Sequence, residues 1–552
     1  MSKIEKTNFD LEISKIPKGF RRTFEIIPGF VSWSFLLLFI ILSFIQPVAA
    51  AFILIAFDLF WLIKSLSIAG RLIQGYVRLH QTDNVDWATR LSDLHNIDSA
   101  IDRLSKTSTK SNGYSLYFEN KRYIRFLNLI RLKKHIKNPD QIYNAVIIAT
   151  YNESNDILEP TVKSLVSSAY DQKNKMIVLI AYEERGGLQI EQTVNKIINK
   201  YSRDFLIIKS IKHKHDVKGE VMGKGPNITN AGRLLEKMVL DMGIPIDDVV
   251  VTTLDSDNRP SEQYFNYLTF LYATSDNRLA QSYQPVAMFY NNIWDAPAAM
   301  RVVAAGNSFW NVSLSMRPHL IRNFSAHAQG LAALIKTDFW SVETIVEDGH
   351  QFWRSYFTFG NDYEVVPMYT PIYQDAVLAG TYLRTILVQF KQIRRWAWGA
   401  SDIAYVAYYG LKDKTIRKSD KLSKFFRLFE SHFSWATAPL ILAFMAWAPL
   451  FLNPGSNKSI VVHQLPIVVS RIQTVTMVGL FITVIISLLS LPPRPKEYRK
   501  SKSLLMIFQW ILFPVTTIVF GSIAALNAQT RLMLGKYLEE FEVTEKAVKH
   551  AD

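Results

Sequence analysis

Two aspartates, Asp255 and Asp257, stand one residue apart where a run of β-branched residues ends, in the segment VVVTTLDSDNRP (residues 249–260). At the end of a strand, where the chain must turn, both carboxylates can face one pocket. They repel each other unless a cation lies between them and a ligand, and hard divalent ions such as Mg²⁺ and Mn²⁺ prefer carboxylate and phosphate oxygens. A solvated turn is the alternative, because Asp-Ser-Asp-Asn is also good turn composition.

A second acid pair, Glu347 and Asp348, lies in the segment VEDGHQFWR (residues 346–354). A carboxylate within hydrogen-bond reach of a hydroxyl group can take its proton as a general base. The like charge of the neighbouring acid can raise the apparent pKa of one of the two. The alternative is structural, since the helix dipole favours acids at a helix N-terminus.

Gln392, Arg395 and Trp396 form a Q-x-x-R-W motif, and their spacing places Gln392 beside the other two on one face of a helix. An arginine can hold phosphate through two hydrogen bonds, and an indole offers a flat apolar platform for a sugar ring. An amphipathic helix at a membrane surface would carry the same residue types, and both interpretations can hold at once.

Short apolar runs that alternate with helix-like segments must position these residues. The predicted strands are residues 144–150, 176–182, 205–211 and 249–254, and the helix-like segments between them are 159–169, 189–201 and 228–242. This alternation predicts an α/β domain whose mostly parallel sheet is covered on both faces.

Polar and mostly acidic residues follow three of these strands, in TYNES (150–154), YEERGG (182–187) and DSD (255–257). Ligands of open α/β sheets bind outside the carboxyl ends of the strands. The chain has no GxGxxG and no GxxxxGK[ST] segment, so dinucleotide-binding and P-loop interpretations lose their main support. It also has no cysteine, which excludes disulfides and thiolate-bound metal sites.

Long apolar runs predict membrane-spanning helices, because each can cross or nearly cross a hydrocarbon core ~30 Å thick. These runs are residues 30–46, 48–69, 433–452, 474–491 and 503–526. The formal net charge is +15, and the basic residues gather beside the runs. The positive-inside rule then predicts a multi-pass protein of the cell membrane with a large cytoplasmic domain. Membrane lipids are expected partners, and nucleic acid is not.

The side of the membrane on which residues 527–552 lie is left open. Three C-terminal spans would place this charged segment outside. A helix broken or made re-entrant at Pro514, or a further membrane element within residues 460–471, would return it to the cytoplasm.

Five motifs, IIATYNES, GKGPNITNAG, TTLDSDNRP, VEDGHQFWR and QIRRWAWG, occur in the order seen in membrane-embedded family 2 glycosyltransferases. That family includes the cellulose, chitin and hyaluronan synthases. The resemblance covers about residues 140–410 and the flanking apolar runs. It implies a GT-A fold, a Mg²⁺ or Mn²⁺ cofactor, and inverting transfer of a hexose from a nucleotide-diphosphate donor, with UDP as the expected nucleotide. The acceptor would be a growing polysaccharide or a lipid-linked glycan.

The resemblance also assigns donor-binding residues. Thr150, Tyr151 and Glu153 match the first-strand loop that holds the nucleotide. Glu183 or Glu184, with Glu184 preferred, stands where the family usually has an aspartate near the base, and this departure weakens a strict uridine preference.

Lys224 and Asn227 match the basic donor-binding segment of the family. Asp255 and Asp257 resemble its DxD motif, whose second acid ligates the metal. Asp348 resembles the catalytic base. Glu347, Gln392, Arg395 and Trp396 would bind the acceptor and the diphosphate.

The resemblance and the apolar runs divide the chain into seven parts. They are an N-terminal cytoplasmic segment (1–28), two membrane helices (29–69), a basic helical linker (70–140), the glycosyltransferase domain (141–372), interfacial helices with the Q-x-x-R-W motif (373–430), about three membrane helices (431–526) and a charged tail (527–552). The enzyme could be processive or add single sugars. A transporter or channel with a non-catalytic nucleotide-sensing domain is the alternative function. The sequence names neither the sugar, the linkage nor the oligomeric state.

Overall fold

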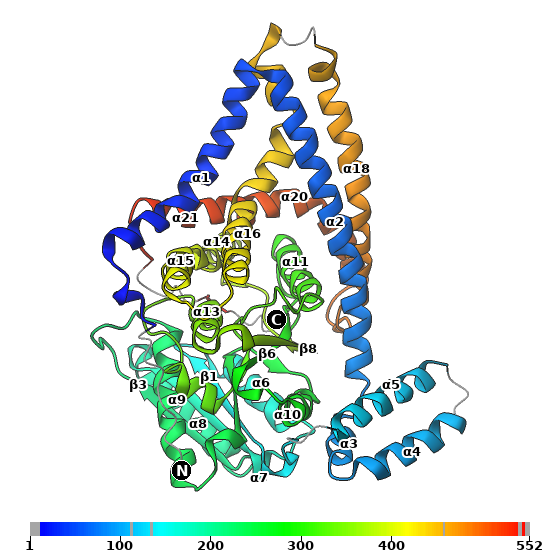
Figure 1. Cartoon of the computed structure of the whole chain (residues 1–552), viewed down its shortest axis with the longest axis vertical. Coiled ribbons are helices and arrows are strands. Elements are labelled where there is room, and N and C mark those ends of the chain that lie inside the picture. Colours follow the sequence, from blue (N-terminus) through cyan, green and yellow to red (C-terminus); the bar gives the residue numbers. More distant parts are fainter. Residues whose placement is uncertain (1–10, 111–113, 133–135, 456–458, 539–543, 547–552) are drawn as a thin grey trace.

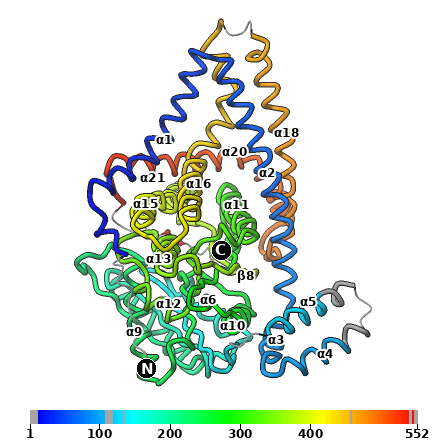
Figure 2. Tube along the Cα trace, viewed as in Figure 1, coloured from blue at the N-terminus to red at the C-terminus, as the bar shows by residue number. Residues whose placement is uncertain are grey.

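The computed structural model describes residues 11–110, 114–132, 136–455, 459–538 and 544–546. Parts of the predicted N-terminal segment (1–10) and of the charged tail (539–543 and 547–552) lie outside the described residues. The described chain forms an α/β domain at one end of the molecule and a group of long helices at the other (Figures 1 and 2).

The predicted parallel strands are confirmed. β1 (Tyr143–Thr150), β2 (Met176–Glu183), β3 (Ile207–His213) and β4 (Val249–Asp255) lie side by side in the order β3-β2-β1-β4, all parallel. β1 and β2 are apolar along almost their whole length, as strands buried on both faces must be. Alternate residues therefore pack into separate cores: Val146 joins the core beside α6 (Asn155–Val166) and α10 (Tyr264–Thr274), and Ile147 joins the core beside α9 (Lys224–Asp241).

The sheet continues beyond β4 with mixed directions, so the α/β class is confirmed with a mixed sheet. Within the described residues it has eight strands in the order β3-β2-β1-β4-β7-β6-β8-β5. β7 (Ala328–Gly330) is antiparallel to β4 and β6 (Gln281–Met288), whereas β8 (Glu364–Tyr373) runs parallel to β6 and antiparallel to β5 (Arg259–Pro260). α8 (Gly187–Tyr201) packs on β2 and β3, and α11 (Ala298–Ser315), α12 (Leu331–Lys336) and α13 (Glu347–Phe359) lie beside the mixed half.

In the part of the chain that the structure describes, four helical segments are long and apolar enough to cross a membrane: α1 (Lys18–Ile45), α2 (Pro47–Asp83), α18 (Ile460–Leu489) and the segment Ser501–Met533. The predicted run 433–452 is not among them, because it is divided between α16 (Lys418–Phe444) and α17 (Ala448–Leu452). Residues 460–471 are the first turns of α18 and form no separate element. Five predicted spans thus become four candidates among the described residues, with α16 rising beside them (Figure 1).

The segment Ser501–Met533 is not one regular helix. It consists of α19 (Ser501–Phe508), a 3₁₀ turn (Gln509–Leu512), α20 (Phe513–Thr516), a π-helical stretch (Thr517–Ile523) and α21 (Ala524–Met533). Pro514 lies in this broken part. α20 and α21 run across the direction of α1 and α2 in Figure 1.

The chain beyond this segment returns to the α/β domain, where Lys546 forms a β-bridge with Leu378. Residues 544–546 and the α/β domain therefore lie on the same side of any membrane that the helices cross. This arrangement agrees with the broken-helix alternative for the C-terminal segment.

Two helical groups connect the domain to the long helices. α14 (Tyr382–Ala397), a 3₁₀ turn (Trp398–Ser401) and α15 (Asp402–Lys412) lie between the sheet and the long helices. α3 (Trp87–Asp93), α4 (Ile97–Lys110) and α5 (Tyr114–Arg131) follow α2 and project to one side in Figure 1.

Candidate active site

The carboxyl ends of β1, β2 and β4 meet at one edge of the sheet, as the sequence predicts. In the register of the sheet Ala149 pairs with Asp255, and Thr150 pairs with Tyr182. The loops that follow β2 and β4 therefore each begin one strand spacing, about 4.8 Å, from the loop that follows β1. The acidic residues at the strand ends therefore lie at one edge of the sheet.

Lys224, the first residue of α9, joins two of the predicted motifs. Its ammonium nitrogen lies 2.7 Å from Asp255 Oδ1 and 3.8 Å from Glu347 Oε1, and it donates a hydrogen bond to the carbonyl oxygen of Ser325. The lysine side chain is 7% exposed, so these charges interact with little screening by water. Gly225 permits this packing, because a Cβ atom there would lie 2.5 Å from the Ser341 carbonyl oxygen.

Asp348, in the first turn of α13, faces the same group of charges. Burial raises the pKa of Asp348, and Lys224 and Arg395 are close enough to oppose that shift. Burial, and then the charge of Asp348, also raise the pKa of Glu347, which is 3% exposed. Residues from four of the predicted motifs are thus close enough to affect one another's protonation.

The adjacent acids predict the pH dependence of sugar transfer. A general base works in its deprotonated form, so sugar transfer should rise with pH through the pKa of Asp348. Burial and the charge of Asp348 raise the pKa of Glu347, so Glu347 keeps its proton while Asp348 loses its own, and Glu347→Gln should leave this rise at the same pH. The measurement is the pH profile of kcat. A rise that moves to lower pH in Glu347→Gln would show that Glu347 is the first of the two acids to become charged.

The loop after β1 is held by Glu153. The Glu153 carboxylate accepts hydrogen bonds from Thr150 Oγ1 and from the Tyr151 backbone nitrogen, both at 2.7 Å. Glu153 therefore shapes the loop predicted to hold the nucleotide. The guanidinium carbon of Arg185 lies 4.2 Å from the centre of the Tyr151 ring and closes one side of this loop.

The two glutamates after β2 have different surroundings. Glu183 is buried and pairs with Arg185 at 2.5 Å. Glu184, the preferred base contact, is exposed and accepts a hydrogen bond from the His215 backbone nitrogen at 3.1 Å. Asn227, predicted to bind donor, donates to the carbonyl oxygen of Ala181 at 2.8 Å and so ties α9 to β2.

A cavity of about 860 Å³ lies at the carboxyl ends of β2 and β3. Its lining includes Glu183, Glu184, Arg185, Trp398 and Tyr405. Asp255 and Asp257 do not line this cavity, whose lining includes the loop after β2. The predicted nucleotide-binding loop after β2 therefore borders a space large enough for a drug-sized ligand.

The Q-x-x-R-W motif lies near the end of α14, as predicted, and α14 is a helix throughout. The Arg395 side chain is largely buried and acts electrostatically on both Asp255 and Asp348. The Trp396 ring lies 6.0 Å from the ring of Phe289, which follows β6. The Gln392 amide donates to Thr544 Oγ1 at 3.4 Å. The motif thus acts electrostatically on the acids through Arg395 and contacts the C-terminal segment through Gln392.

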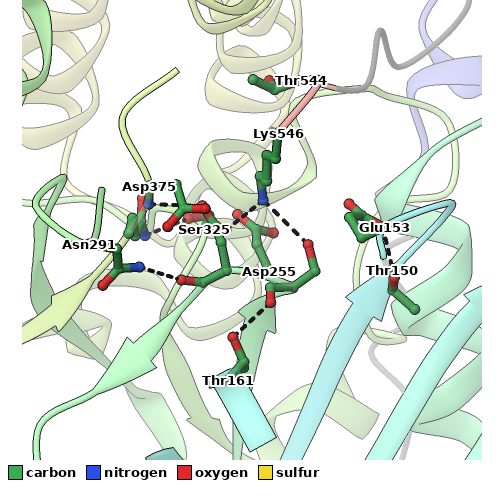
Figure 3. Close-up of polar contacts among 12 residues, drawn as sticks. Thr150, Glu153, Thr161, Asp255, Asn291, Ser325, Asp375, Thr544 and Lys546 are labelled. Atoms are coloured by element: carbon green, nitrogen blue, oxygen red, sulfur yellow. Dashed lines mark hydrogen bonds and ion pairs between the residues drawn. The ribbon is translucent and has the colours of Figure 1, made fainter. Parts of the chain in front are cut away.

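Lys546 is a residue of this site that the sequence did not reveal. Its ammonium nitrogen lies 2.7 Å from Asp257 Oδ1 and 3.3 Å from Ser256 Oγ (Figure 3). Burial disfavours the ammonium form, but the charges of Asp257 and Glu153 outweigh it and raise the pKa of Lys546. No sequence pattern indicates this contact, because 290 positions separate Lys546 from Ser256.

Asp375, in the loop after β8, is a second unpredicted residue of the site. Its backbone nitrogen donates to Asp257 Oδ2 at 3.0 Å. Burial and the nearby charge of Asp257 raise the pKa of Asp375 to about 6. Within the described residues, no three or more His, Cys, Asp or Glu side chains are grouped to hold a metal ion.

The chain shows weak similarity to several solved glycosyltransferase structures. One is a mannosyltransferase from Pyrobaculum calidifontis in complex with GDP-Man and Mn²⁺, at 13% identity and a TM-score of 0.38, over 79% of this chain and 99% of that one. Residues 1–349 of S. aureus TarS match at 11% identity and a TM-score of 0.34, over 72% and 93% of the two chains. GalNAc-T7 with UDP, GalNAc and Mn²⁺ matches at 10% identity and a TM-score of 0.29, over 55% and 58%.

No protein-family model and no curated protein matches this chain. Identities and TM-scores this low carry no information about its donor, acceptor or metal.

Proposed function

We propose that this protein is an inverting membrane glycosyltransferase of the family 2 type. It would transfer a hexose from a nucleotide-diphosphate donor to a growing polysaccharide or a lipid-linked glycan. The observation that carries this proposal is the network in which Lys224 joins Asp255 to Glu347, with Asp348 and Arg395 within electrostatic reach. A domain that only senses a nucleotide does not need a further acid such as Asp348 beside the pair that Lys224 forms with Asp255.

Each group has a role in this reaction. The Asp348 carboxylate removes the proton of the acceptor hydroxyl as that oxygen attacks the anomeric carbon. A new C–O bond forms, the bond from the anomeric carbon to the diphosphate oxygen breaks, and the nucleoside diphosphate leaves with the electron pair. Lys224 and Arg395 provide positive charge for the leaving diphosphate. Trp396 provides an apolar face for the acceptor sugar.

A divalent cation fits the site, because Asp375 Oδ1 is buried and accepts no hydrogen bond beside Asp257. Bound with a donor, Mg²⁺ or Mn²⁺ would neutralise the negative charge that develops on the diphosphate. Such ions usually take one or two protein carboxylates and complete their shell with phosphate and water.

The setting of the site supports a membrane enzyme. The interfacial helices α14 and α15 lie between the sheet and the four candidate spans. We propose that the α/β domain is cytoplasmic, where nucleotide-sugars are made, and that the acceptor approaches from the side of α14. The cavity at the ends of β2 and β3 would hold the nucleoside.

The test is turnover. The full-length protein, purified in detergent, is offered a panel of nucleotide-sugars with Mg²⁺ or Mn²⁺, and the release of nucleoside diphosphate and the product length are measured. We expect release from at least one donor, dependent on the metal. Donor binding without release would instead support a transporter or channel with a sensing domain.

A further inference from the structure

A cation already lies in the acid cluster at the end of β4. The Lys546 ammonium is buried between Asp257 and Ser256, and Glu153, Asp255 and Asp375 also act on it electrostatically. Figure 3 shows this side chain entering the cluster from the C-terminal segment, away from the strands that carry the acids. A buried charge is stable only where opposite charges surround it, so the position of this nitrogen marks a cation site.

Hydrogen bonds of the two residues that flank Asp375 in the chain hold it at this position. The neighbouring Gln374 backbone nitrogen donates to the carbonyl oxygen of Met288, at the end of β6. Ala376 exchanges two hydrogen bonds with the Asn292 side chain, at 2.7 and 2.9 Å. These contacts hold the loop after β8 to the chain after β6 without any help from Lys546. The Asp375 carboxylate is therefore preorganised beside Asp257.

The acids of the cluster differ in how well their charge is compensated. Asp255 has its own lysine, because Lys224 lies 2.7 Å from its Oδ1 atom. Among the described residues Asp375 has no lysine of its own: its side chain is 6% exposed, its hydrogen-bond partner is the neutral Asn291 side chain, its buried Oδ1 accepts no hydrogen bond, and the guanidinium nitrogen of Arg259 is 4.0 Å away. Asp257 and Asp375 are therefore the acids whose negative charge requires a further cation.

We propose that Asp257 and Asp375 together bind the divalent ion, and that the ion takes the position of the Lys546 ammonium. This inference deepens the proposed function and rests on it for the role of the ion. It replaces the sequence-predicted pair Asp255 and Asp257 with a pair that lies 118 positions apart in the chain. Asp255 would instead orient Lys224 toward the diphosphate.

Mn²⁺ binding to the full-length protein in detergent tests this proposal, measured by calorimetry or electron paramagnetic resonance with the metal alone. Asp375→Asn and Asp257→Asn should each weaken Mn²⁺ binding by at least roughly tenfold. Asp375→Glu keeps a carboxylate and should retain measurable binding. Asp362→Asn, which changes an exposed acid just before β8, is the matched control and should bind normally. Circular dichroism checks that each variant is folded.

Lys546→Met supplies the second arm. Because this substitution removes the competing ammonium, Mn²⁺ should bind at least severalfold more tightly than to the unmodified protein. Normal Mn²⁺ affinity in Asp375→Asn, or unchanged or weaker affinity in Lys546→Met, overturns the proposal, as does a protein that binds no Mn²⁺.

The failure of this inference can be told from failure of the proposed function. If the protein binds Mn²⁺ through Asp375 but releases no nucleoside diphosphate from any donor, the proposed function fails and the cation site stands. If sugar transfer occurs while Asp375→Asn binds Mn²⁺ normally and Asp255→Asn does not, the enzyme stands and the sequence-predicted pair is restored.

Discussion

Asp348→Asn should reduce sugar transfer by roughly 100- to 10,000-fold, the usual contribution of a positioned general base. The amide occupies the same volume but cannot accept the proton of the acceptor hydroxyl. Donor binding should be unchanged, because the proposed mechanism assigns the nucleotide and diphosphate to the ends of the strands and to Lys224. The measurements are kcat with a saturating acceptor and the dissociation constant of the donor.

Asp362→Asn is the matched control for Asp348→Asn, since both change one carboxylate near an end of α13 and Asp362 is exposed. It should keep full activity. If Asp348→Asn retained more than a tenth of the activity, Asp348 would not be the base, and its neighbour Glu347 would be the next candidate.

Lys224→Met should have the largest combined effect on activity and stability. Lys224 is the ammonium between Asp255 and Glu347, and its removal leaves the buried Glu347 and the partly exposed Asp255 without that partner. Breaking a fully buried pair typically costs about 3–5 kcal/mol of unfolding free energy, and the exposure of Asp255 places this loss at the lower end. The loss of a positive charge at the diphosphate should also lower kcat by roughly 100- to 1,000-fold.

A double variant separates these two effects. Lys224→Met with Asp255→Asn removes one of the unpaired carboxylates, so part of the lost stability should return while activity stays low. Lys237→Met, an exposed lysine on the same helix, should change neither quantity. Thermal unfolding in detergent and kcat are the measurements. Normal activity in a folded Lys224→Met variant would remove Lys224 from the proposed mechanism.

The sequence was sufficient to predict the strands of the parallel half of the sheet. Residues 144–150 form a strand that is buried on both faces, and a continuous apolar run has few other stable arrangements in a compact domain. The acids after β1, β2 and β4 met at one edge for the same reason, because parallel strands share the side on which they end. Lys224 could be predicted as a donor-site residue from its motif, but not as the partner of Glu347.

The sequence was less informative about the membrane helices. An apolar run shows that a helix is buried in a membrane or in the protein interior, but it does not show whether the helix is continuous or how it is oriented. The run 433–452 was divided between two helices, and the run 503–526 became a broken segment lying across α1 and α2. Packing between helices decides such features, and it depends on neighbours that are distant in the chain.

What the sequence determined by itself was the α/β class, the strand ends and the residue types that can bind a diphosphate and accept a proton. These follow from local hydrophobic pattern and side-chain chemistry. The tertiary structure alone decided that Lys546 and Asp375 join Asp257. Any segment that packs against a buried site can bring a charged side chain into it, whatever its distance along the chain. The local sequence around Asp257 therefore does not indicate which distant residues supply those charges.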